Sequence, residues 1–383
     1  MDPLSPTAQR FPLIPRPRPG CVPLPRRVAG LAELATAAQR GEASPGSASS
    51  VFNQAALLAS DLDLPQLARE WCHRHANIYL QSGEPRSGMD AIRGLEPLVN
   101  LARLHIRANR GDQGHEILNG LYDAISTATP ASVDGINVPA DLVASAADRD
   151  EVRHWLWRVI LADGARALIS TGQWTEALAH VQRHHGIGER MLDGRQVAVL
   201  TRITAGDHGG AIELVTATTA GEAWENAVTA CLEILCTWPS HRATAQEIDN
   251  LLANRAQVDF QADLVVFQTR LMLSIIDAAR GSSHAGLRLD AIQLVDQILT
   301  VADGYAASDV LNHPGITALL DDERISQLEQ TVKACALAST DLPADLRAEL
   351  EEAMDISEAS IRQTLTSSLT AQASPAGTGK ARL

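Results

Sequence analysis

The chain has 383 residues, of which 45% are hydrophobic but only 3% aromatic, and its formal net charge is −14. A single hydrophobic core stops growing at roughly 250–300 residues, so we expect two domains or an elongated fold. An acidic surface disfavours direct nucleic-acid binding, because that binding depends on neutralising phosphates with basic side chains. Since aromatic residues are rare, small and aliphatic side chains must supply most of the packing, which suits closely approaching helices.

Cysteine usage and the N-terminus indicate the compartment. Five scattered cysteines without a C-x-x-C pair predict buried thiols rather than disulfides or a zinc site. The sequence shows neither a signal peptide nor eighteen consecutive apolar residues, so we expect a cytoplasmic protein without a membrane span. The only lysines are Lys333 and Lys380; such a preference for arginine, with many alanines, is typical of GC-rich coding DNA, as in actinobacteria.

Residues 1–27 differ from the rest of the chain because they are rich in proline and arginine. This composition favours extended polyproline II, so we expect an arm. The arm could dock on the acidic body of this protein, bind an aromatic groove of a partner, or stay disordered. At the other end, the composition of residues 370–383 predicts a disordered tail.

The residues between these ends show a helical pattern almost throughout. In one example, Phe260, Leu264, Phe267 and Leu271 recur every three or four positions. Period-two alternation bounded by hairpin turns is hard to find, which predicts an all-α fold. We expect a helical domain over residues 28–320, interrupted by an inserted loop at about 127–149, and C-terminal helices over 321–369.

Three segments repeat a turn followed by a helix, and each has a glycine at the turn: Gly111, Gly172 and Gly206. An aliphatic residue follows six positions later in all three, and an alanine five positions later in two. Gly172 and Gly206 are 34 residues apart (206 − 172), the period of tetratricopeptide repeats. We expect these glycines to adopt the positive φ that ends a helix.

These segments resemble degenerate tetratricopeptide (TPR) repeats of bacterial regulatory and scaffold proteins, over about residues 50–220. "VFNQAALLAS" and "PLVNLARLHIR" resemble the first helix of such a repeat. The chain departs from the family pattern because Gly111 and Gly172 are 61 residues apart (172 − 111), which the inserted loop explains. The resemblance implies antiparallel helix pairs stacked as a right-handed α-solenoid, with the first helices lining a groove.

Several polar residues on these first helices lie at a similar distance before a turn. The set comprises Asn53, Asn100, Arg103, Asp163 and Gln196. The resemblance implies that they line the groove and grip a peptide backbone, because an amide both donates and accepts hydrogen bonds. Two alternatives are exposed polar faces and bonds between neighbouring helices; Asp163 could equally form an internal ion pair with Arg166.

Two further groups of side chains are candidates for a site. His180 and His184 are four residues apart and could share a metal ion, but no third ligand is specified. We therefore expect surface or helix-capping histidines. Trp155 and Trp157 are expected in the core, with a tryptophan protruding into the groove as the alternative. The sequence specifies no cofactor and no catalytic residue.

These observations favour a non-catalytic regulatory or interaction protein that binds a peptide, a protein segment or a small signalling ligand in its groove. The alternative is an accessory or enzymatic all-α protein, for instance in natural-product biosynthesis, with an interhelical pocket that uses His180, His184 or Asp163. A structural homo-oligomer is a third hypothesis.

Overall fold

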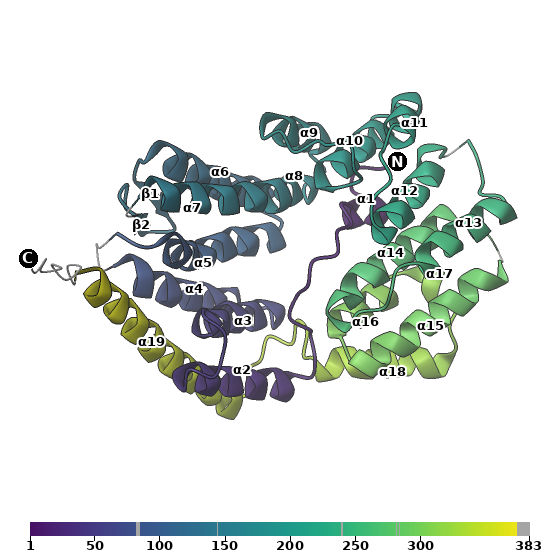
Figure 1. The fold of residues 1–383 in the computed structure, drawn as a ribbon. Coiled ribbons are helices and arrows are strands. Elements are labelled where there is room, and N and C mark those ends of the chain that lie inside the picture. The colour runs from purple at the N-terminus through teal and green to yellow at the C-terminus, as the bar shows by residue number, and fades with distance from the viewer. Residues whose placement is uncertain (82–84, 144, 239, 281, 283, 374–383) are drawn as a thin grey trace, which may run out of the picture.

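The computed structural model describes residues 1–81, 85–143, 145–238, 240–280, 282 and 284–373, with side chains described to residue 367. It confirms the all-α prediction, since the described part is mostly helical with one two-stranded hairpin (Figure 1). The helices form two groups, seen left and right in Figure 1, and an N-terminal arm runs between them.

The first group has its own hydrophobic core, built from residues 24–160 and 350–365; the last residue of the first range, Ile160, begins the π-helical turn that leads into the second group. Most of its helices pack on the helices before and after them in the chain. Its elements are α2 (Leu24–Gln39), α3 (Ser47–Asp61), α4 (Pro65–Leu80), α5 (Gly88–Arg107), α6 (Gly111–Thr127), β1 (Ala131–Val133), β2 (Ile136–Val138), α7 (Ala146–Val159) and α19 (Ala344–Ala373).

The second group has a separate core, built mainly from residues 165–328. Three residues of the arm, Ala8, Phe11 and Leu13, belong to this core. Its elements are α1 (Pro6–Arg10), η1 (Ile160–Gly164), α8 (Ala165–Ile169), α9 (Trp174–Arg183), α10 (Asp193–Thr204), α11 (His208–Thr216), α12 (Ala223–Cys236), α13 (Ala245–Ala256), η2 (Ala262–Leu264), α14 (Val265–Ala278), α15 (Ala285–Val301), α16 (Gly304–Leu311), α17 (Pro314–Thr317) and α18 (Asp322–Ala334).

Both ends of the chain therefore cross from one group to the other, which corrects the predicted boundaries. Residues 28–320 do not share one core, and residues 321–369 do not form a unit. Helix α18 packs on α16 in the second group, whereas α19 packs on α2 and α3 in the first. Sequence pattern shows which face of a helix is apolar, but it does not show which distant helix will cover that face.

The arm and the predicted loop also differ from the expectation. The arm contains the short helix α1, and its last four residues already belong to α2, because proline is tolerated in the first helical turn. In the predicted loop, β1 and β2 pair through Asp134 and Gly135, which both have positive φ. Asp-Gly is a strong hairpin signal, and the prediction of a loop overlooked it. Of the predicted tail, residues 370–373 continue α19, and 374–383 lie outside the described residues.

The three repeat glycines play different roles. Gly172 and Gly206 have φ of +77° and +81°, as expected of helix-ending turns. The expectation of a positive φ is wrong for Gly111. This residue is the first of α6, and the positive φ before that helix belongs to Asn109. A Cβ on Gly111 would lie 2.0 Å from the carbonyl oxygen of Ala167. This glycine therefore allows α6 and α8 to approach closely.

Gly111→Ala is expected to lower the free energy of unfolding by about 1–3 kcal/mol, because the methyl group would force two backbones apart. Gly206→Ala is the matched control, since no described atom lies within 4 Å of the place its Cβ would take and the cost is only that of a positive φ. Denaturation by urea checks both. A loss in Gly111→Ala no larger than the loss in Gly206→Ala would contradict the close-approach role of Gly111.

His75 is an unpaired polar group in the first core. It is 1% exposed, and neither ring nitrogen has a hydrogen-bond partner among the described residues. Its ring stacks on Phe52 at a centroid distance of 5.1 Å. Burial lowers the pKa of His75 to about 3, so the ring is neutral in the folded protein at neutral pH.

His75→Phe is expected to raise the free energy of unfolding by about 1–3 kcal/mol, because it removes two buried unpaired nitrogens and keeps the stacking. The substitution also changes how the free energy of unfolding depends on pH. The unfolded state binds a proton below pH about 6.5 and the folded state only below about 3, so His75 reduces stability as pH falls through this range, at about 1.4 kcal/mol per unit. The variant should lose this slope in denaturation measured from pH 7 to 4, whereas exposed His154→Phe should keep it.

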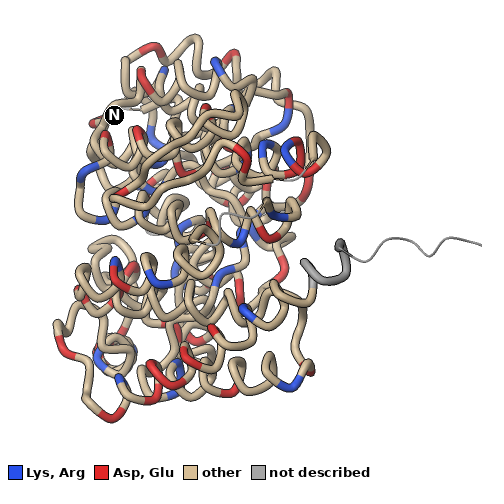
Figure 2. The backbone as a smooth tube through the Cα atoms, turned by 90° about the vertical axis from the view of Figure 1, so that its left-hand side faces the viewer, with Lys and Arg blue, Asp and Glu red and all other residues tan. Residues whose placement is uncertain are grey.

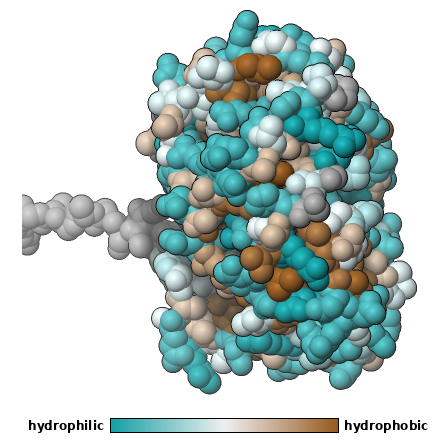
Figure 3. Space-filling model, turned by 90° about the vertical axis from the view of Figure 1, so that its right-hand side faces the viewer, coloured by the Kyte–Doolittle hydropathy of each residue, from teal (hydrophilic) through white to brown (hydrophobic). Residues whose placement is uncertain are grey.

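The surface gives a general indication of what the protein contacts. Along the backbone in Figure 2, basic and acidic residues are interspersed. On the face in Figure 3, apolar side chains form small groups among hydrophilic ones. None of the helices within the described residues has the length and apolar character needed to cross a membrane.

Candidate functional site

A pocket of about 310 Å³ lies in the first group, between α3, α5 and α7. Three predicted groove residues line it, and they come from two helices: Asn53 from α3, and Asn100 and Arg103 from α5. The arm contributes Pro19 to the pocket wall. The structure thus brings together residues that are about 50 positions apart in the sequence.

The polar side of the pocket is a row of linked side chains. Asn53 Nδ2 donates to Glu96 Oε2 at 2.7 Å, and Asn100 Nδ2 donates to Asn53 Oδ1 at 2.9 Å. Arg103 Nη1 then donates to Asn100 Oδ1 at 3.0 Å, and its Nη2 donates to Asp163 Oδ2 at 2.7 Å. We call these five residues the polar row. Each link fixes the orientation of the next side chain.

Helical periodicity places most of this polar surface on one face of α5. Glu96, Asn100, Arg103 and Arg107 are spaced by four, three and four residues, and all line the pocket. Burial raises the pKa of Glu96, while its bond from Asn53 and the nearby arginines oppose that shift. The Arg103 side chain is 50% exposed, so its guanidinium is accessible to a ligand.

The rest of the pocket lining is mostly apolar and includes an aromatic side chain. Its apolar residues include Ala56, Leu57, Val99, Leu104, Trp155 and Val159. Trp155 is half-buried and lines the pocket, as in the alternative considered for it. Cys72 also lines the pocket, but burial raises the pKa of its thiol to about 12, so it is not a thiolate at neutral pH.

Asp163 is not among the residues that line the pocket, but it pairs with Arg103, which does, and not with Arg166. It belongs to η1, a π-helical turn that continues α7 into α8. A π turn shifts the register of a helix by one residue. Arg166, on the next turn, contacts the arm instead.

Gln196 is the predicted groove residue that the structure places elsewhere. It lies on α10 in the second group and is completely buried. Its amide contacts both the arm, through Leu13, and the carbonyl of Met191. The expectation of one continuous groove holding all five residues is therefore wrong for Gln196, because α10 packs around the arm rather than around the pocket.

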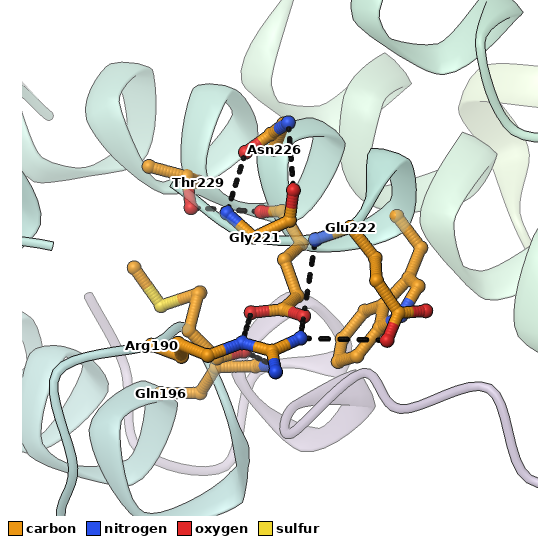
Figure 4. Close-up of polar contacts among 9 residues, drawn as sticks. Arg190, Gln196, Gly221, Glu222, Asn226 and Thr229 are labelled. Atoms are coloured by element: carbon orange, nitrogen blue, oxygen red, sulfur yellow. Dashed lines mark hydrogen bonds and ion pairs between the residues drawn. The ribbon is translucent and has the colours of Figure 1, made fainter. Parts of the chain in front are cut away.

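Figure 4 draws Gln196 together with Arg190 and the start of α12. The Arg190 guanidinium bonds to Glu225, whose side chain is 1% exposed and belongs to the capping box that begins α12. Gly221 and Asn226 are joined by hydrogen bonds at the same helix start. These contacts hold helix ends in place, so we assign them to the fold.

The histidines form a cluster, but not the one expected. His180 is 2% exposed, which corrects the prediction of a surface or capping position, whereas His184 does end α9. His180 Nε2 lies 2.8 Å from the carbonyl oxygen of Ile160, and its Nδ1 lies 3.1 Å from His115 Nε2. A carbonyl only accepts, so His180 carries its proton on Nε2 and His115 donates to Nδ1.

Both nitrogens of His180 are therefore occupied, and this argues against a shared metal ion with His184. Within the described ranges, no group of three His, Cys, Asp or Glu side chains could hold a metal. Burial is the largest cause lowering the pKa of His115 and His184, each to about 4, so the cluster is neutral at physiological pH.

Four polar residues of the pocket, Gln54, Ser60, Glu96 and Arg107, were not predicted from the sequence, and two of them had a readable signal. Glu96 and Arg107 lie on the same helical face as Asn100 and Arg103, so extending the α5 spacing in both directions finds them. Gln54 had no such signal, because its neighbour Asn53 was the expected groove residue.

No family model matches this chain, and comparisons with curated proteins and with solved structures also find no match. Function must therefore be inferred from the chemistry of the site itself.

Proposed function

We propose that this chain is a non-catalytic, TPR-like interaction protein that binds a peptide, a protein segment or a small ligand in the pocket between α3, α5 and α7. One observation carries the proposal: four linked polar side chains, Asn53, Glu96, Asn100 and Arg103, line the same pocket as a set of apolar side chains. Ligand sites characteristically combine an apolar lining with a few convergent polar groups.

The polar row retains hydrogen-bonding capacity beyond its internal bonds. A side-chain amide has two N–H donors and an oxygen with two lone pairs. Asn100 gives one donor to Asn53 and accepts one bond from Arg103. The remaining capacity, with the half-exposed Arg103 guanidinium, suits a ligand that carries amide or other polar groups beside an apolar part.

The size of the pocket limits what it holds at one time. A volume of about 310 Å³ is at the lower end for small-molecule sites, which range from roughly 300 to 1,000 Å³. This fits one or two side chains of a peptide, or a compact small ligand. The alternative is that the polar row only joins α3 to α5.

Affinity capture from the source cells, with the double variant Asn53→Ala, Asn100→Ala, tests the proposal. The wild-type protein should retain a specific partner or ligand, and the double variant should lose at least tenfold in its affinity for it while staying folded. Asn250→Ala, an exposed asparagine on α13, is the matched control and should bind as the wild type does. Unchanged binding by a folded double variant would contradict the proposal and would leave the polar row as a link between helices.

A further inference from the structure

The arm crosses the molecule as an extended peptide held mainly through its backbone. It begins beside α10, where the N-terminal ammonium of Met1 donates to the carbonyl of Ile203 at 3.4 Å. The Trp174 indole donates to the carbonyl of Pro3 at 3.0 Å. Figure 1 shows the arm then running between the two groups of helices toward α2.

Gln196 binds the arm as a neighbouring strand would. The Leu13 amide donates to Gln196 Oε1 at 2.7 Å, and Gln196 Nε2 donates to the Leu13 carbonyl at 3.0 Å. Both polar atoms of one peptide residue are thereby paired by a single side chain. This is recognition of an extended backbone that does not depend on the identity of the residue.

Two further side chains bind the backbone of the arm. Arg166 donates to the carbonyls of Gln9, Phe11 and Pro12 at 2.8, 3.1 and 3.3 Å. Burial lowers the pKa of Arg166 to about 10, so it is still protonated at neutral pH. Farther along, the Asp303 carboxylate accepts from the Cys21 amide at 2.8 Å. Without a peptide in place, Gln196, Arg166 and Asp303 would lose these bonds to the arm, which is unfavourable for a buried donor or acceptor.

The groove also selects side chains. Phe11 is completely buried and Leu13 is 2% exposed, whereas residues 16, 17, 19 and 20 of the arm are exposed. Basic residues meet acidic ones at both ends of this stretch: Arg10 pairs with Asp277, and Arg16 pairs with Asp193 at 2.6 Å. The groove therefore fits an extended segment with three consecutive buried residues, Phe11, Pro12 and Leu13, flanked by arginines.

We propose that the groove between α8, α10, α14 and α16 is an exchangeable peptide-binding site, occupied in cis by the arm and able to bind in trans an extended arginine- and proline-bearing peptide of the same pattern. Gln196, Arg166 and Asp303 bind peptide N–H and C=O groups. These bonds form equally well whether the bound segment is joined to this chain or belongs to a separate peptide, so exchange is chemically reasonable. This groove is a different site from the pocket of the proposed function, although Pro19 of the arm also lines that pocket.

The test uses a chain that begins at Pro23 and a fluorescent synthetic peptide of residues 1–22. We expect saturable binding with one peptide per chain. Full-length protein should bind at least tenfold more weakly, since its groove is already filled. Gln196→Leu should weaken the binding at least tenfold, and exposed Gln257→Leu should not. A peptide with Phe11→Ala and Leu13→Ala is the matched ligand control.

A second version keeps the test decisive if the shortened chain does not fold. A specific protease site is inserted between the exposed Pro19 and Gly20 and is cut after the full-length protein has folded. Excess labelled peptide should then replace the cut fragment while the circular dichroism stays unchanged. Replacement that occurs only as the protein unfolds, or a folded shortened chain that does not bind the peptide, would overturn the proposal. Asn53→Ala with Asn100→Ala should leave this binding unchanged, so the two proposals fail separately.

Discussion

Replacing Asp61 with alanine is expected to lower the free energy of unfolding by about 3–5 kcal/mol, the usual cost of breaking a buried ion pair from one side. The Asp61 side chain is 2% exposed. It accepts from Arg27 Nη2 at 2.7 Å, from Arg107 Nη1 at 2.9 Å and from the Tyr305 hydroxyl. Arg27 is itself only 8% exposed, so the variant would bury a charge without its partner.

Asp61 also joins the two groups of helices, because Arg27 and Arg107 belong to the first group and Tyr305 to α16 in the second. Asp296→Ala is the control: it removes a carboxylate that pairs with Arg324 but is 52% exposed, and should cost no more than about 1 kcal/mol. Both values follow from urea denaturation. Similar losses in the two variants would show that the Asp61 network contributes no more than a surface pair.

Phe11→Ala is expected to lower the free energy of unfolding by about 3–5 kcal/mol, because it empties a completely buried aromatic site in the second core. Urea denaturation measures the loss. Trypsin provides a local measurement, since the bond after Arg10 should become cleavable as the arm undocks more often.

Leu4→Ala is the matched control for the arm. Leu4 is 59% exposed, so its removal should change stability by no more than about 0.5 kcal/mol and leave trypsin resistance unaltered. Equal resistance of the Phe11 variant and the wild type would contradict the anchoring role of Phe11.

The helical content could be predicted from the sequence because helix formation depends on local periodicity. The resemblance to TPR repeats implied that Asn53, Asn100 and Arg103 line one groove, and the structure places all three at one pocket. Periodicity was not sufficient for Gln196. The position of Gln196 in its helix indicates which face of α10 it occupies. It does not indicate that the arm, about 180 residues earlier in the chain, covers that face.

His180 and α19 show the same limit. The spacing of His180 and His184 suggested a shared face. His180 is buried, however, and its ring bonds to Ile160 and His115, which lie 20 and 65 residues earlier in the chain. Likewise α19 has an apolar face whose partners, α2 and α3, lie some 300 residues away. Packing between distant segments decides which element covers a given helix face, and the residue pattern of a single sequence does not show which segments will meet.

Native-state hydrogen exchange on the unmodified chain tests most directly whether the arm is held as a bound peptide. The Leu13 amide is buried and bonded to Gln196, so it should be protected. It should nevertheless exchange through an opening smaller than global unfolding, and before the core amide of Leu200 in α10. Exchange of Leu13 and Leu200 together, at the free energy of global unfolding, would contradict the account and would make the arm an inseparable part of the second core.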